Sequence, residues 1–163
     1  MERLEQYAQH HGLSLQERLG FGVHGSVYSV IRQDVVGRSA VKVHDREDSY
    51  LRERDVYLRL RDEQVTQVCG VNVPQLLDFD DELWIIDMSV VSKPFALDFA
   101  GAYLDERPDF SEEVLAEWRA AKAEQFGTDW PKVNTILWAL QRQGIHLMDV
   151  NPNNIALDDP MSQ

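Results

Sequence analysis

Two polar side chains near the end of the sequence stand at a spacing that could serve phosphate chemistry. Asp149 and Asn154 enclose the segment Val150-Asn151-Pro152-Asn153. A hard cation that bridges phosphates needs one or two protein oxygens, which an amide and carboxylates can supply. Asn and Pro are also turn formers, so the segment taken alone favours a simple Asx-rich turn. The choice between these interpretations depends on motifs elsewhere in the chain.

Three glycines form the pattern Gly20-Phe21-Gly22-Val23-His24-Gly25. Glycines at this spacing let backbone N–H groups approach a phosphate chain closely. The same pattern occurs in dinucleotide-binding folds, but there a helix opens directly after the glycines. Here the β-branched and aromatic stretch 26–32 follows and predicts a strand. A glycine-rich hairpin without a ligand is the alternative.

A lysine follows one hairpin later, in the predicted strand 39–43. Strand alternation puts Ala40 and Lys42 on one face of this strand, and Val41 and Val43 on the other. The small alanine can leave room for a planar base while the ammonium group reaches the phosphates. Most lysines are solvated on the surface, but the flanking valines mark the opposite face of this strand as buried.

One carboxylate lies on an otherwise apolar helix face. Glu53 shares this face with Tyr50, Tyr57 and Leu60. Burying a carboxylate is costly unless a cation accompanies it, and Lys42 is the candidate partner. The alternative is a glutamate at the edge of the helix that reaches solvent.

Taken together, these motifs resemble those of the protein-kinase superfamily. The glycines and Val27 are similar to its G-x-G-x-x-G-x-V loop, and Ala40-Val41-Lys42 is similar to its V-A-I-K strand. Glu53 resembles the glutamate of the first large helix, and the segment 149–154 matches the catalytic-loop pattern D-x-x-x-x-N. The four motifs occur in the family's order and span residues 20–154.

The resemblance implies ATP and Mg²⁺ as cofactors and gives the residues their roles. Lys42 and Glu53 would position the phosphates, Asp149 would accept the proton of a substrate hydroxyl, and Asn154 would hold Mg²⁺. Met88 and Ser89 would offer backbone groups to adenine. The acceptor would be a protein Ser/Thr or a small-molecule hydroxyl.

The sequence also departs from the family. Leu147-Met148 replaces the His-Arg before the catalytic aspartate, and Asn151 replaces a lysine, which is closer to small-molecule and atypical kinases. No Asp-Phe-Gly follows Asn154. We expect Asp158 or Asp159 either to substitute for that magnesium ligand or to form a solvated acidic turn.

Three functional hypotheses follow from the matches and the departures. The favoured one is a minimal ATP-dependent phosphotransferase. A pseudokinase that acts as a nucleotide-binding or protein-interaction module without catalysis is the alternative, since the substrate lobe is missing. A fragment of a longer kinase is the third, although the polar tail 158–163 reads as a natural end.

The periodicity of hydrophobic residues and the positions of turn-forming residues predict the helices and strands that must position these side chains. We expect strands from about residue 13 and over 26–32, 39–43, 75–79 and 83–91, with turns at 34–38 and 80–81. We expect helices over 2–10, 48–61, 111–126 and 131–142, and within 94–104. The resemblance implies a single α+β domain over 1–163 with a two-lobed kinase-like fold. An antiparallel β lobe with one helix would occupy 1–90, and a reduced helical lobe 91–163.

Composition limits the partners. The 163 residues are 44% hydrophobic, which suffices for one core, and carry a net charge of -12. This charge argues against nucleic-acid and anionic-membrane surfaces, because phosphate-binding faces need a basic excess. The single cysteine, Cys69, cannot form an internal disulfide. With no apolar leader or membrane-length segment, we expect a cytoplasmic protein whose partners are ATP and a protein substrate or partner.

Overall fold

The computed structural model describes residues 1–33 and 37–158 and divides into two compact units. The first unit comprises Met1–Gln64 and Pro74–Val90, and the second comprises Val65–Val73 and Val91–Gln163. Both units combine helices with strands, which confirms the α+β class expected from the sequence. Among the described residues, no helix has the length and apolar character needed to cross a membrane.

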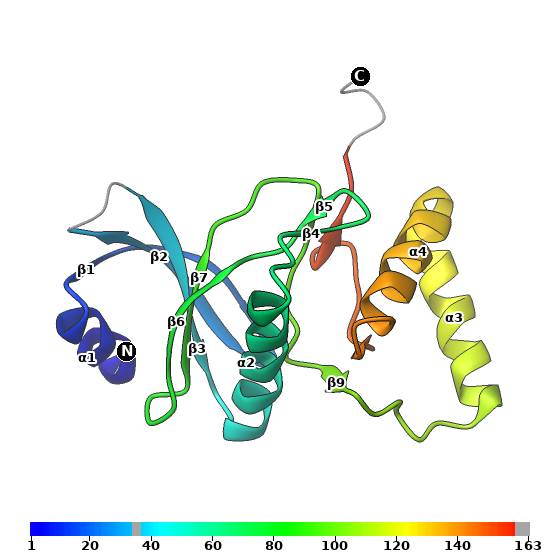
Figure 1. Cartoon of the computed structure of the whole chain (residues 1–163), viewed down its shortest axis with the longest axis horizontal. Coiled ribbons are helices and arrows are strands. Elements are labelled where there is room, and N and C mark those ends of the chain that lie inside the picture. Colours follow the sequence, from blue (N-terminus) through cyan, green and yellow to red (C-terminus); the bar gives the residue numbers. More distant parts are fainter. Residues whose placement is uncertain (34–36, 159–163) are drawn as a thin grey trace. The chain divides into compact units, whose positions relative to one another are not determined.

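A five-stranded antiparallel sheet forms the centre of the first unit, in the order β1-β2-β3-β7-β6 (Figure 1). Its strands are β1 (Leu13–Gly22), β2 (Gly25–Arg32), β3 (Arg38–His44), β6 (Leu76–Asp80) and β7 (Ile85–Ser89). All five were expected from the sequence within a few residues. The expected turn at 34–38 includes residues 34–36, which lie outside the described residues.

One helix covers each face of this sheet (Figure 1). α1 (Glu2–His10) buries Leu4 and Tyr7 in a cluster with Val41 of β3. α2 (Glu47–Asp62) lies on the other face, where Glu53 meets Lys42 of β3. Because successive side chains of a strand point to opposite faces, β3 contributes Val41 and Val43 to the α1 side and Lys42 and His44 to the α2 side.

The buried face of α2 is the one predicted from helical spacing. Tyr50, Tyr57 and Leu60 are all buried, and Glu53 lies among them with only 1% of its surface exposed. Tyr50 stays in the core because its hydroxyl reaches the surface turn and donates a hydrogen bond of 2.6 Å to Asp81.

Two helices dominate the second unit. α3 (Glu112–Phe126) begins after Ser111, whose hydroxyl accepts a hydrogen bond from the N–H of Val114. A short 3₁₀ turn (Gly127–Asp129) leads into α4 (Trp130–Gln141), which has a proline in its first turn. The apolar stripe of α4 is fully or nearly fully buried and consists of Val133, Ile136, Leu137 and Leu140.

Short strands complete the second unit. One small sheet pairs β9 (Ala102–Leu104) with β10 (Ile145–Leu147). The other has the order β11-β8-β5-β4, formed by β4 (Gln67–Val68), β5 (Val71–Asn72), β8 (Phe95–Ala96) and β11 (Ile155–Ala156).

The helix expected within residues 94–104 is wrong, because this segment forms β8 and β9 instead. β8 pairs with β11 and β5, and β9 pairs with β10, so the backbone bonds go to partners distant in the sequence. The segment between them also bends away from helical geometry at Asp98, whose φ is 61°. Tertiary pairing has overridden local helix propensity here.

Candidate functional site

The lysine predicted to bind phosphate lies on β3 with its side chain in the interior of the first unit. Lys42 is only 5% exposed. Its Nζ lies 2.7 Å from Oε2 of Glu53 on α2, so the expected ion pair is present. A buried lysine is tolerated because the carboxylate compensates its charge. The solvated-lysine and solvent-edge alternatives for these two residues are therefore both excluded.

A histidine joins this ion pair, and the sequence analysis had given it no role. His44 is fully buried, and its Nε2 lies 2.6 Å from the same Oε2 of Glu53. Its Nδ1 lies 3.2 Å from the backbone carbonyl of Trp84. Both partners are acceptors, so a ring nitrogen that carries a proton can donate to the acceptor it faces. Its place two residues after Lys42, on the same strand face, was the available signal.

In the cluster of Lys42, Glu53 and His44, a lysine ammonium group and an imidazole ring both contact the same carboxylate. Burial alone would raise the pKa of Glu53, but the charge of Lys42 and the hydrogen bond from His44 outweigh it and lower the pKa to about 2. Glu53 is consequently ionised at neutral pH.

The glycine turn joins β1 to β2, with Gly22 directly opposite Gly25. At Gly25, φ is +145° and an added Cβ would lie 2.1 Å from the carbonyl oxygen of Val43, so the backbone of β3 excludes any side chain. A Cβ added at Gly20 or Gly22 would meet no atom within 4 Å. The turn is thus fixed against β3 at one glycine and leaves open space beside the other two.

The remaining residues predicted to contact the nucleotide lie on neighbouring strands. Val27 is opposite Lys42, and Ala40 is opposite Met88. Ala40 and Met88 are buried, and the sulfur of Met88 accepts a hydrogen bond from the Tyr57 hydroxyl.

The backbone N–H of Ser89 is already used within the first unit. It donates to the carbonyl of Gln75, and the Ser89 hydroxyl accepts from the Gln75 N–H. The adenine contact predicted for Ser89 therefore cannot use this N–H while the two hydrogen bonds persist.

The second unit brings Asp149 and Asn154 together in one tight loop. The side-chain N–H of Asn154 donates to the backbone carbonyl of Asp149 at 3.4 Å. Within the loop, the backbone N–H groups of Asn154 and Ile155 both bond to the carbonyl of Asn151. Asp149 is exposed and packs against Gly101, where an added Cβ would lie 2.8 Å from the Cβ of Asp149.

Helix α3 anchors this loop from outside. The indole N–H of Trp118 donates to the carbonyl of Met148 at 3.2 Å, and the ammonium of Lys122 donates to the carbonyl of Val150. These bonds hold the backbone on both sides of Asp149. The sequence analysis missed both anchors, because the loop-facing positions of α3 carry no pattern that distinguishes them from ordinary surface residues.

The candidate magnesium ligands form no dense cluster. Over residues 1–33 and 37–158, no group of three or more His, Cys, Asp or Glu side chains is placed to hold a metal ion. Asp158 is exposed, two residues after β11, and Asp159 lies outside the described residues. The protein part of a magnesium site would fall to Asn154 with Asp158, which is enough only for an ion that takes its other ligands from phosphates and water.

Comparison with known proteins gives no family assignment. The chain matches no model of a known protein family and no curated protein sequence.

Proposed function

We propose that this chain is a minimal kinase-like protein that binds ATP and transfers its phosphoryl group to a hydroxyl of a protein or a small molecule. The observation that carries the proposal is the buried pairing of Lys42 with Glu53. A lysine held in this way on a strand next to a glycine turn presents a fixed positive charge, and the resemblance to the kinase superfamily gives this pair a phosphate-positioning role.

Electrostatics supports a local phosphate site in an otherwise acidic chain. The net charge of -12 repels anions at long range, so a triphosphate needs a concentrated positive charge to be held. Lys42 supplies this charge behind the turn, and the open space at Gly20 and Gly22 lets backbone N–H groups face a ligand.

In the proposal, the second unit supplies proton transfer. Asp149 is exposed and its backbone is fixed by α3, which suits a base that must meet an incoming hydroxyl. Asn154 shares its loop and is the candidate cation ligand. Bound ATP would supply the transferable phosphoryl group, and Mg²⁺ would neutralise charge on its oxygens.

The proposal is tested by incubating the purified protein with Mg²⁺ and labelled ATP and following transfer and hydrolysis. We expect turnover that Asp149→Asn lowers at least a hundredfold, since general base catalysis contributes on the order of 10²–10⁴. Asp109→Asn, an exposed aspartate elsewhere in the second unit, is the matched control and should keep full activity. Turnover that is absent, or that survives Asp149→Asn, rules out the phosphotransferase.

A nucleotide-binding pseudokinase is the second candidate. It is favoured by the absence, within the described ranges, of an acidic cluster that could hold the metal strongly. An ATP-induced rise in melting temperature without turnover would select it, because a ligand that binds the folded state stabilises that state. Lys42→Met should abolish this rise. If ATP does not raise the melting temperature of the protein and is not turned over, both candidates are wrong.

A further inference from the structure

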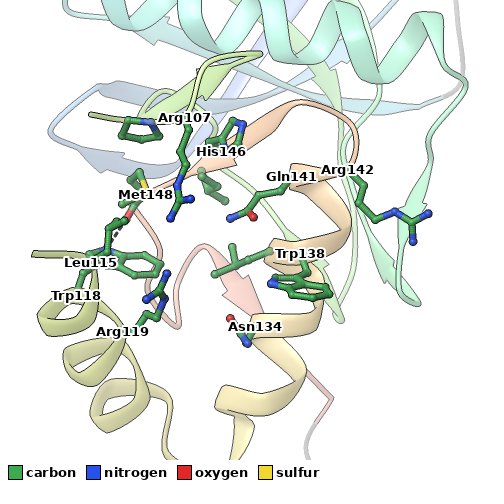
Figure 2. A pocket seen from close by; sticks show the side chains of 13 residues that line it. Arg107, Leu115, Trp118, Arg119, Asn134, Trp138, Gln141, Arg142, His146 and Met148 are labelled. Carbon is green, nitrogen blue, oxygen red and sulfur yellow. Dashed lines mark hydrogen bonds between the residues drawn. The ribbon is translucent and has the colours of Figure 1, made fainter. Parts of the chain in front are cut away.

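The second unit contains a pocket that the proposed function does not use. It has a volume of about 590 Å³ and is formed by α3, α4 and the segments 107–108 and 146–148 (Figure 2). This volume is typical of small-molecule sites and is too small for a folded partner. Its lining combines leucines with two indole rings, three arginines and the amides of Asn134 and Gln141.

The charge of the pocket is opposite to that of its surroundings. Residues 65–73 and 91–163 contain twelve Asp and Glu but only six Lys and Arg. All three arginines of this unit, Arg107, Arg119 and Arg142, line the pocket, and no Asp or Glu does. A local excess of guanidinium groups in an acidic unit is a feature that an anionic ligand would explain.

Two of these arginines are placed to hold an anion. Figure 2 shows the guanidinium groups of Arg107 and Arg119 directed toward the pocket, whereas that of Arg142 is turned away from it. Arg107 has an exposed ion pair with Glu112 at 3.8 Å, which is too long and too solvated to compete strongly with a ligand. Over residues 1–33 and 37–158, the guanidinium group of Arg119 has no hydrogen-bond or ion-pair partner.

The aromatic part of the pocket has one fixed ring and one open ring. Trp118 is held by its hydrogen bond to Met148 and packs edge-on against Trp130. Trp138 also belongs to α4, but it lies outside the buried stripe of that helix and is 69% exposed. An indole exposed to this degree beside a pocket can be covered by a planar ring, which gains stacking and apolar burial.

We propose that this pocket binds a small aromatic anion. Its carboxylate or phosphate group lies between Arg107 and Arg119, and its ring stacks on Trp138. The amides of Asn134 and Gln141 are available for hydrogen bonds to polar substituents. The site needs neither ATP nor phosphotransfer, so it stands or falls separately from the proposed function.

The test is a titration of the whole chain followed by NMR of the indole N–H groups. The chain has four tryptophans, and Trp138→Phe identifies the signal of interest. Phenyl phosphate and benzoate are the probes, and they distinguish the two anionic groups. Phenol and inorganic phosphate are the controls that lack, respectively, the charge and the ring. We expect saturable movement of the Trp138 signal with at least one probe, and much weaker binding of both controls.

Variants decide whether the arginines are responsible. Arg119→Gln and Arg107→Gln should each weaken binding of the better probe at least about tenfold, since each removes a charge-assisted hydrogen bond to the anion. Arg142→Gln removes the same charge from the same pocket edge and should leave binding unchanged. The unshifted signals of Trp84 and Trp130 report whether each variant is folded. No saturable shift with either probe, or equal losses in all three variants, overturns the proposal.

Discussion

His44 Nε2 lies 2.6 Å from Glu53 Oε2, and this is the oxygen that Lys42 also contacts. The carboxylate is therefore shared between a strand lysine and a strand histidine, both on the face of β3 that α2 covers. Glu53 is therefore the centre of the cluster. Its removal should cost more stability than the removal of Lys42.

Glu53→Gln should destabilise the protein more than Lys42→Met does. The glutamine leaves the buried ammonium group of Lys42 without the counter-charge of Glu53, whereas the methionine leaves Glu53 its histidine partner. We expect Glu53→Gln to lower the free energy of unfolding by about 3–5 kcal/mol, as measured by urea denaturation. Glu63→Gln, exposed at the end of the same helix, is the control and should change stability by less than about 0.5 kcal/mol. Equal losses for Glu53→Gln and Lys42→Met would show that His44 does not share the carboxylate.

The stability of the protein should depend on acid through Glu53. Its pKa is about 2 in the folded state and near 4.5 when unperturbed, so the unfolded state binds the proton more readily. The stabilisation is fully present above pH 4.5 and is lost as the pH falls through 2, on the order of 3 kcal/mol in total. Glu53→Gln lacks this contribution. The wild-type and variant unfolding free energies should therefore converge between pH 4.5 and 2, and a constant difference would contradict the assigned pKa.

Two glycines of the same turn should respond in opposite ways to alanine. Gly25→Ala places a methyl group 2.1 Å from the backbone oxygen of Val43, at a φ that L residues avoid, and should cost several kcal/mol or prevent folding. Gly22→Ala meets no atom and should change the melting temperature little. Comparing the two variants distinguishes Gly25, which the fold requires, from Gly22, which has open space for a ligand beside it. If Gly22→Ala instead destabilises the protein as much as Gly25→Ala, the turn is packed more tightly than this structure shows.

Removing an α3 anchor should loosen the loop that carries Asp149. Lys122→Met deletes the charged donor to the Val150 carbonyl, and we expect a loss of about 1–3 kcal/mol together with faster hydrogen exchange over residues 149–155. Lys132→Met, on the exposed side of α4, changes the net charge equally and should leave exchange in the loop unaltered. Identical exchange in both variants would mean that α3 does not anchor the loop.

Local sequence patterns predicted the first unit well and the second unit only partly. The strands of the sheet and the ion pair between Lys42 and Glu53 follow from alternation and helical spacing, which are local signals. The segment 94–104 was mispredicted because its strand partners, β10 and β11, are some fifty residues away and each is only two or three residues long.

The partners of functional groups were the least predictable. His44 could have been placed by extending the alternation of β3 by one step. Trp118 and Lys122 could not, since their bonds to the 148–150 backbone depend on how α3 docks. The pocket beside Trp138 likewise arises from four segments whose approach no local pattern encodes.

The two faces of β3 have a consequence for how this sheet assembles. A slip of one residue in its pairing would push Lys42 and His44 into the apolar layer beneath α1 and leave Glu53 without a counter-ion. Such a misaligned sheet would bury the charges of Lys42 and Glu53 apart from each other. The slip therefore costs far more free energy than a slip in a uniformly apolar strand. The cluster that is proposed to hold phosphate thus also acts as a lock on the alignment of the strands around it.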